Sequence, residues 1–205
     1  MSNYVITINR SFGSGGKTVG KLLAERLGIN YYDRDLIRLA SEESGINVKL
    51  FGRADETGRV GLFKRYNREY GKAIIPPDSD EFTSDDNLFN IQAKIIQDLA
   101  EKENCIIVGR CADHVLAGRS RLIRVFVDAP MDFRIPEVET RYGLPHREAI
   151  REIEKIDRAR AQYYRYYTGQ DWYDARNYDL CLNSAVLGFD RTTEAIRSYL
   201  NIRLG

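Results

Sequence analysis

The sequence lacks several features that would place it in a specialised class of protein. Its 205 residues contain no apolar run near the roughly 18 residues that a membrane-spanning helix requires. The first ten residues hold a short apolar stretch without a basic region and a long apolar core behind it, so we expect no secretory leader. The formal net charge is only +1, whereas duplex-binding proteins usually carry a strong basic excess. We therefore expect a soluble protein that binds neither a membrane nor a nucleic acid polymer.

Cysteine is also scarce. The three cysteines, Cys105, Cys111 and Cys181, are an odd number at wide spacing, and they show no zinc-ligand pattern. Cys105 and Cys181 lie in apolar runs, so we expect both to be reduced residues of the core. This usage is typical of a reducing compartment and predicts a cytoplasmic location.

Short apolar runs alternate with segments of helical period, in a chain whose length suits one domain with an insertion. Because the runs lack polar alternation, they predict a parallel sheet of about five strands between two helical layers, a three-layer α/β/α fold. Residues 45–85 have no clear period and read as an irregular insertion. The expected strands are 4–8, 29–32, 105–108, 122–127 and 180–182, and the expected helices are 18–27, 35–44, 88–99, 146–167 and 191–204. We expect Gly28 to end the first helix and Ser84-Asp85-Asp86 to lead into the third.

Polar residues follow four of the expected strands. In open parallel sheets, ligands bind beyond the carboxyl ends of the strands, so the residues there are site candidates. They are the glycine-rich segment after the first strand, Asp33 after the second, Gly109-Arg110 after the third and Asp128 after the fourth.

The segment Gly13-Ser14-Gly15-Gly16-Lys17-Thr18 lies between an expected strand and an expected helix. It matches the phosphate-loop consensus G-x-x-x-x-G-K-[ST] except at the leading glycine, where Ser11 stands. Backbone N–H groups at a helix N-terminus bind phosphates, and glycine allows their close approach. Lys17 would neutralise β- and γ-phosphate charge, and the Thr18 hydroxyl would bind Mg²⁺, alone or with a carboxylate. The segment therefore predicts an ATP-binding loop.

We interpret one further match to a nucleotide-binding motif as a coincidence. Asp55-Glu56-Thr57-Gly58 matches the D-x-x-G of a GTPase switch. No convincing strand precedes it, and the chain has no N-K-x-D guanine motif.

Arginines are the next signal, because phosphoryl transfer is catalysed mainly by positioning and electrostatic stabilisation. Arg110 stands at a strand end, beside the expected site. Residues 157–167 hold three arginines and four tyrosines, so part of this helix must pack or bind a ligand. We expect Arg160, and then Arg158, to act from a lid, and Trp172 to pack the lid against the body of the protein.

Several segments together resemble the cytidylate-kinase-like proteins of bacteria. They include Phe12-Gly13-Ser14-Gly15-Gly16-Lys17, Tyr32-Asp33-Arg34-Asp35-Leu36-Ile37, Ile107-Val108-Gly109-Arg110-Cys111-Ala112-Asp113, Asp157-Arg158-Ala159-Arg160-Ala161-Gln162-Tyr163-Tyr164, Tyr167-Thr168-Gly169-Gln170-Asp171-Trp172 and Asn177-Tyr178-Asp179-Leu180. The resemblance covers most of the chain and is weakest across 45–85.

The resemblance implies transfer of the γ-phosphate of ATP to CMP or dCMP, with Mg²⁺ as cofactor. It implies a core of residues 1–33, 86–142 and 178–205, a helical monophosphate-binding insertion of about 34–85, and a helical lid of about 143–177. Arg110 would hold the acceptor phosphate, Asp33 would orient the acceptor, and Lys17, Arg110, Arg158 and Arg160 would be catalytic. Cys111 stands where true cytidylate kinases carry an aspartate.

Three hypotheses of function remain open at this point. The first is a nucleoside-monophosphate kinase that uses Mg·ATP. The second is a phosphate-loop kinase of another small molecule, such as a sugar or an antibiotic. The third is a nucleotide-binding protein without catalysis. The sequence leaves the oligomeric state open.

Overall fold

The structure is a computed structural model that describes residues 3–33, 35–51, 70–71 and 74–205. Five parallel strands form one sheet in the order β2-β3-β1-β4-β5. The predicted parallel sheet of about five strands is therefore confirmed. The strands are β1 (Val5–Arg10), β2 (Asn30–Tyr32), β3 (Cys105–Val108), β4 (Leu122–Asp128) and β5 (Leu180–Asn183).

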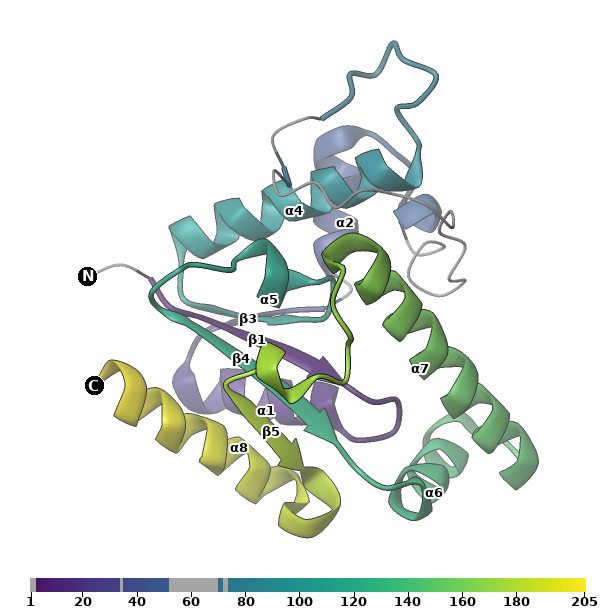
Figure 1. Ribbon diagram of the computed structural model, residues 1–205, viewed down its shortest axis with the longest axis vertical. Coiled ribbons are helices and arrows are strands. Elements are labelled where there is room, and N and C mark those ends of the chain that lie inside the picture. Colours follow the sequence, from purple (N-terminus) through teal and green to yellow (C-terminus); the bar gives the residue numbers. More distant parts are fainter. Residues whose placement is uncertain (1–2, 34, 52–69, 72–73) are drawn as a thin grey trace.

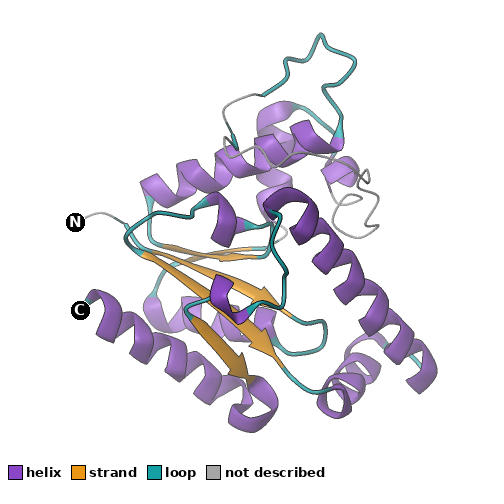
Figure 2. Ribbon diagram, viewed as in Figure 1, coloured by secondary structure: helices purple, strands orange, loops and turns teal. Residues whose placement is uncertain are grey.

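Helices cover both faces of the sheet, and a further helical pair stands beyond its carboxyl edge (Figures 1 and 2). One face carries α2 (Asp35–Ser44), α4 (Asp85–Lys102) and the short α5 (Ala112–Val115). The other carries α1 (Gly16–Leu27) and α8 (Ser184–Leu204). The pair beyond the edge is α6 (Met131–Tyr142) and α7 (His146–Thr168).

The core lies on the two faces of the sheet. Along β1, Val5 packs into the cluster beneath α2 and α4, and Ile6 and Ile8 pack into the cluster beneath α1 and α8. All three are fully buried, which explains why the strand reads as a continuous apolar run. Each such side chain contributes about 1.5–3 kcal/mol relative to exposure. The sheet is thus a rigid base for the residues at its carboxyl edge.

Several expected helix boundaries are confirmed. Gly28 ends α1 in a left-handed conformation with a φ of 62°, and its N–H donates to the carbonyl oxygens of Ala24 and Glu25. Ser84 caps α4, where its side chain accepts a hydrogen bond from the N–H of Asn87. The final helix begins earlier than expected, at Ser184, because the chain is already helical before a kink at Gly188.

Two features differ from the expectations. Helix α6 was not predicted. Met131, Ile135 and Val138 do follow a helical period, but Pro136 inside the segment argues against a helix. The expectation that Cys181 is a core residue is wrong. It is exposed because β5 is an edge strand with half its residues open to solvent, whereas Cys105 is fully buried, as expected.

Part of the insertion lies outside the described residues, including the segment Asp55-Glu56-Thr57-Gly58. Within the described ranges, each helix is too short or too polar to cross a lipid bilayer.

Candidate active site

The loop after β1 is wound tightly around the start of α1. The N–H of Ser14 donates to the carbonyl oxygen of Ser11 at 3.3 Å, and the Ser14 hydroxyl donates to the carbonyl oxygen of Val127 at 2.9 Å. Gly13 and Gly15 have φ values of 86° and 75°, in the left-handed region that favours glycine. A Cβ atom on Gly15 would lie 2.1 Å from the ring of Phe189. Only glycine fits there, because the Phe189 ring of α8 lies against the loop where α1 begins.

Ser11 occupies the position of the leading consensus glycine and anchors the loop to β4. Its hydroxyl donates to Asp128 Oδ1 at 2.6 Å, and its N–H donates to the carbonyl oxygen of Val127 at 3.2 Å. The departure from the consensus therefore adds a link between the loop and the next strand of the sheet.

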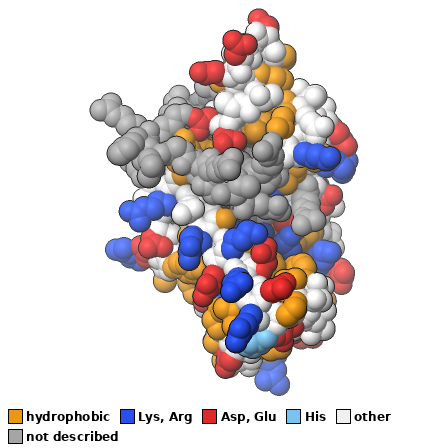
Figure 3. Space-filling view, turned by 90° about the vertical axis from the view of Figure 1, so that its right-hand side faces the viewer, with side chains coloured by type: hydrophobic (Ala, Val, Ile, Leu, Met, Phe, Trp, Pro, Cys, Tyr) orange, Lys and Arg blue, Asp and Glu red, His pale blue; other side chains and the backbone are white. Residues whose placement is uncertain are grey.

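A cavity of about 660 Å³ opens at this edge of the sheet. Figure 3 shows Lys and Arg side chains, with acidic ones among them, on the side of the molecule that carries α6 and α7. The lining includes the loop, the ends of β1 and β3, and the facing sides of α6 and α7. Its charged residues are Arg10, Lys17, Asp33, Arg110, Glu137, Arg141, Glu148, Arg151, Glu152, Lys155 and Arg160.

Asp33 lies between two cations in this cavity. Its Oδ2 atom is 2.6 Å from Lys17 Nζ, and its Oδ1 atom is 3.8 Å from Arg10 Nη2. Asp33 follows β2 and Arg10 ends β1, so the parallel strands bring both to the same edge of the sheet. The loop lysine thus already pairs with an anionic group.

Arg110 reaches the cavity from a strained turn. Gly109, Arg110 and Cys111 have successive φ values of 76°, 60° and 53°, all left-handed. For the two non-glycine residues this conformation costs about 1–2 kcal/mol each. The N–H of Ala112 closes the turn on the carbonyl oxygen of Gly109 at 3.2 Å. Such strain is typical of functional sites, and here it directs a nearly buried guanidinium into the cavity.

Asp113 holds this turn against α7. It is buried, and its carboxylate accepts hydrogen bonds from Asn9 Nδ2 at 3.0 Å and from the Tyr164 hydroxyl at 2.7 Å. Burial raises the pKa of Asp113 above its ordinary value, and the two hydrogen bonds act in the opposite direction. Burial also raises the pKa of Tyr164, so the tyrosine stays a donor.

Known proteins share this arrangement of loop, sheet and helices. The model of the Cytidylate kinase-like family matches residues 5–186. The chain belongs to the cytidylate kinase-like family. The membership places this protein among the phosphotransferases and confirms the resemblance expected from its motifs.

Two archaeal relatives align over almost the whole chain. The cytidylate kinase of Methanopyrus kandleri is 25% identical over 206 residues, with 96% of this chain and 93% of the relative covered. The cytidylate kinase of Methanosarcina mazei is 27% identical over 201 residues, with 98% of each covered.

Solved structures show the same fold. An uncharacterized protein from Eubacterium ventriosum superposes with a TM-score of 0.73 at 26% identity, over 97% of this chain and 99% of the other. Shikimate kinase from Bacteroides thetaiotaomicron superposes with a TM-score of 0.56 at 15% identity, over 97% and 98%. At that identity, the second likeness concerns the fold alone.

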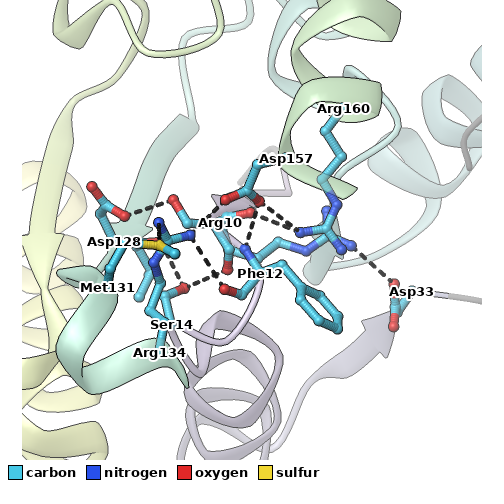
Figure 4. A network of polar contacts seen from close by, with 11 residues as sticks. Arg10, Phe12, Ser14, Asp33, Asp128, Met131, Arg134, Asp157 and Arg160 are labelled. Atoms are coloured by element: carbon cyan, nitrogen blue, oxygen red, sulfur yellow. Dashed lines mark hydrogen bonds and ion pairs between the residues drawn. The ribbon is translucent and has the colours of Figure 1, made fainter. Parts of the chain in front are cut away.

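In this phosphotransferase, Asp157 joins the phosphate loop to α6 and α7 (Figure 4). Its carboxylate accepts hydrogen bonds from the N–H of Phe12 at 2.7 Å and from Arg134 Nη1 at 2.5 Å. Burial raises the pKa of Asp157, and both hydrogen bonds oppose that effect. Arg160, one turn further along α7, donates from Nη1 to the carbonyl oxygen of Arg10 at 3.1 Å and lies over the ring of Phe12. Asp157 and Arg160 thus connect α7 directly to the loop and to the end of β1.

The predicted site residues are only partly gathered in the cavity. The predicted residues that line it are Gly13, Gly15, Gly16, Lys17, Asp33, Arg110 and Arg160. Ser14, Thr18 and Arg158 are not part of the lining, and Arg158 is exposed on α7. The catalytic role of Arg158 stays a prediction.

The tyrosine-rich part of α7 is packed rather than solvated. Tyr163, Tyr164 and Tyr167 are buried, and so is Trp172, whose ring meets that of Phe126 edge-on with centroids 5.2 Å apart. The expected packing of Trp172 is confirmed.

Sequence reasoning missed four cationic residues of the cavity. They are Arg10, Arg141, Arg151 and Lys155. The rule that identified Asp33, a polar residue at the carboxyl end of a strand, also applies to Arg10 and could have found it. Arg141 was missed because it lies on α6, which was not predicted; its Nη2 donates a hydrogen bond to Thr18 Oγ1 at 3.3 Å.

Proposed function

We propose that this protein transfers the γ-phosphoryl group of ATP to a nucleoside monophosphate, CMP or dCMP, and so forms the diphosphate and ADP. The observation that carries the proposal is the cavity at the sheet edge. Around it, the phosphate-loop Lys17, the acceptor-side Asp33 and the arginines Arg110 and Arg160 face one space. The cytidylate kinases of Methanopyrus kandleri and Methanosarcina mazei support this choice of acceptor.

The loop would bind the donor. Backbone N–H groups of residues 13–18 would hold the phosphates at the positive end of α1, as helix N-termini do. Lys17 would leave Asp33 and neutralise charge on the β- and γ-phosphates. Asp33, once released, would orient the acceptor at the neighbouring strand end.

The donor would enter as Mg·ATP, and the metal would neutralise charge on its phosphate oxygens. Thr18 is the candidate residue to hold it, because a hydroxyl oxygen suits a hard cation such as Mg²⁺. Asp33 and Asp128 offer further oxygen donors near the loop. Within the described ranges, His, Cys, Asp and Glu side chains form no group of three that could hold a metal.

The arginines would stabilise the reaction. Phosphoryl transfer passes through a loose state, so positioned positive charge is the main catalytic device, and a dedicated base is not required. Arg110 would hold the acceptor phosphate from its strained turn. Arg160 and Arg158 would close over the moving group with α7 and exclude water. Because Asp157 ties α7 to Phe12, we expect this closure to tighten the loop as well.

The proposal is tested by mixing the purified protein with Mg·ATP and, separately, CMP, dCMP, UMP, AMP and GMP. ADP and the matching diphosphate are measured by chromatography. We expect turnover with CMP or dCMP above the other acceptors. Lys17→Met serves as the negative control, and it should lose about 100- to 1,000-fold in kcat, the usual cost of one transition-state contact.

Other outcomes distinguish the alternatives. The monophosphate-kinase proposal would be contradicted if no monophosphate led to ADP while a non-hydrolysable ATP analogue still raised the melting temperature. In that case, a screen of sugars and other small alcohols beside the analogue separates another kinase from a non-catalytic binder, since ligands of the native state stabilise it.

A further inference from the structure

The end of β1 carries a buried cation that the proposed reaction has not used. Arg10 is the last residue of β1, is only 8% exposed and lines the cavity. Its Nε atom is buried and has no hydrogen-bond partner in the described part of the chain. Burying a guanidinium costs free energy unless its charge and its N–H donors are satisfied, so this arrangement favours binding of an anion.

The surrounding backbone is shaped around this side chain. A Cβ atom on Gly16 would lie 2.4 Å from Arg10 Cβ, and one on Gly109 would lie 2.4 Å from Arg10 Nη1. Glycine at both positions thus leaves a slot between the phosphate loop and the turn that carries Arg110. The carbonyl oxygen of Arg10 also accepts the hydrogen bond from Arg160 of α7. Arg10 therefore touches the donor loop, the acceptor turn and the lid helix.

Asp33 marks the place where an anion meets Arg10. Its two carboxylate oxygens face two different cations, with Oδ2 at 2.6 Å from Lys17 Nζ and Oδ1 at 3.8 Å from Arg10 Nη2. Figure 4 shows Arg10 extending from the end of β1 toward Asp33, with Arg160 entering from α7. A phosphoryl group also presents paired oxygens to an arginine fork. If it displaced Asp33, it would contact Lys17 and Arg10 together.

We propose that Arg10 is a catalytic residue that binds the γ-phosphoryl group of ATP together with Lys17, and that Asp33 holds this place when no phosphate is bound. The inference rests on the proposed function, because it assumes ATP as the donor. It makes a distinct prediction, since Arg10 should recognise the γ-phosphate and not the rest of the nucleotide.

The experiment compares the affinities for a non-hydrolysable ATP analogue and for ADP, measured by calorimetry with the whole chain. Arg10→Met removes the fork and keeps a stem of similar length. We expect it to weaken binding of the ATP analogue by about tenfold and binding of ADP by less than twofold, the range for a hydrogen-bonded charge contact. Arg10→Lys, which keeps the charge but not the fork, should weaken the analogue by about threefold.

Arg119→Met is the matched control. Arg119 is a half-buried arginine whose Nε, like that of Arg10, has no partner within the described residues, but it lies before β4, at the opposite edge of the sheet. The ratio of the two affinities should stay at the wild-type value in this variant. Thermal unfolding of all variants reports folding, and Arg10→Lys decides the question if Arg10→Met does not fold.

Equal loss of ATP-analogue and ADP affinity in the Arg10 variants would overturn the inference, because Arg10 would then only shape the loop. An unchanged affinity ratio would overturn it as well. These measurements need no acceptor, so they are separate from a failure of the monophosphate-kinase proposal. Where turnover is observed, Arg10→Met should lower kcat by about 100-fold and change the acceptor KM by less than threefold, since the contact forms with the transferred group.

Discussion

Lys17 Nζ lies 2.6 Å from Asp33 Oδ2, so the lysine of the phosphate loop is already paired with a carboxylate from another strand end. The carboxylate stands where a phosphate of the donor would have to bind Lys17. In the proposed reaction, ATP would therefore break the Lys17–Asp33 ion pair to form a new one with Lys17. The exchange would free Lys17 for the donor and Asp33 for the acceptor, and its effect on the affinity for ATP can be measured.

Asp33→Asn should tighten ATP binding while it weakens turnover. The amide keeps the size of the side chain but no longer competes with phosphate for Lys17, so we expect about a fivefold gain in affinity for a non-hydrolysable ATP analogue. Calorimetry measures this gain, which should shrink at high salt. Asp98→Asn, which breaks an exposed 2.6 Å ion pair with Lys94 on α4, should leave the affinity for the ATP analogue unchanged. Weaker analogue binding in Asp33→Asn would contradict the exchange.

Gly109→Ala should lower kcat more than Gly118→Ala does, while both should lower the unfolding free energy by similar amounts. Gly109 and Gly118 both have left-handed φ values, 76° and 89°, so alanine at either should cost about 1–2 kcal/mol of unfolding free energy. The added methyl group meets Arg10 Nη1 at Gly109 and meets nothing within 4 Å at Gly118. Urea unfolding should therefore give similar losses, whereas kcat should fall at least tenfold only in Gly109→Ala. Equal activities would show that Arg10 can move without consequence.

The two predicted lid arginines should differ in their effect on catalysis. Arg160 lines the cavity and already contacts the loop, whereas Arg158 is exposed on the same helix. We expect Arg160→Met to lower kcat by about 100-fold, and Arg158→Met to lower it less, because Arg158 reaches the site only if α7 moves. Single-turnover kinetics measures both. A larger loss in Arg158→Met would mean that closure rearranges α7 more than its present contacts indicate.

Asp113 should make the stability of the protein depend on pH. Folding raises its pKa above the ordinary value of 3.8, so the folded state favours the protonated acid. Its contribution is fully present below the unfolded pKa of about 4 and is lost as pH rises through the folded pKa. Asp113→Asn cannot titrate, so the unfolding free energy of the wild type relative to this variant should fall as pH rises from about 4.

Urea unfolding at intervals from pH 4 to pH 8 tests this dependence. The exposed Asp98→Asn variant is the control and should follow the wild type across the range. A difference between wild type and Asp113→Asn that is constant with pH would exclude Asp113 as the source.

Much of the fold could be predicted from the sequence, because strands and helices leave local patterns of apolar residues. The strand at 105–108 and the helix at 35–44 were predicted at the boundaries that the structure shows. Continuous apolar residues make a strand buried on both faces, and a helical period needs only neighbours along the chain. Helix α6 was missed although Met131, Ile135 and Val138 follow that period, because Pro136 stands inside it. Its arginine at 141 was missed for the same reason.

The candidate site was harder to read, because a side chain's partners depend on distant segments. Cys105 and Cys181 both lie in apolar runs, yet one is buried in an inner strand and the other is exposed on an edge strand. The sequence cannot tell them apart, since strand order is set by how the helices pack over the sheet.

The sequence by itself determined the phosphate loop, because the glycines set a backbone turn that depends on a few neighbouring residues, and Lys17 and Thr18 follow that turn directly in the chain. It also determined which residues stand at strand ends. Only the tertiary structure decided which of these meet. Parallel strands and the packing of α7 bring Arg10, Lys17, Asp33, Arg110 and Arg160 around one cavity and leave Arg158 outside it. Such juxtaposition depends on contacts between residues far apart in the chain, and no local pattern encodes it.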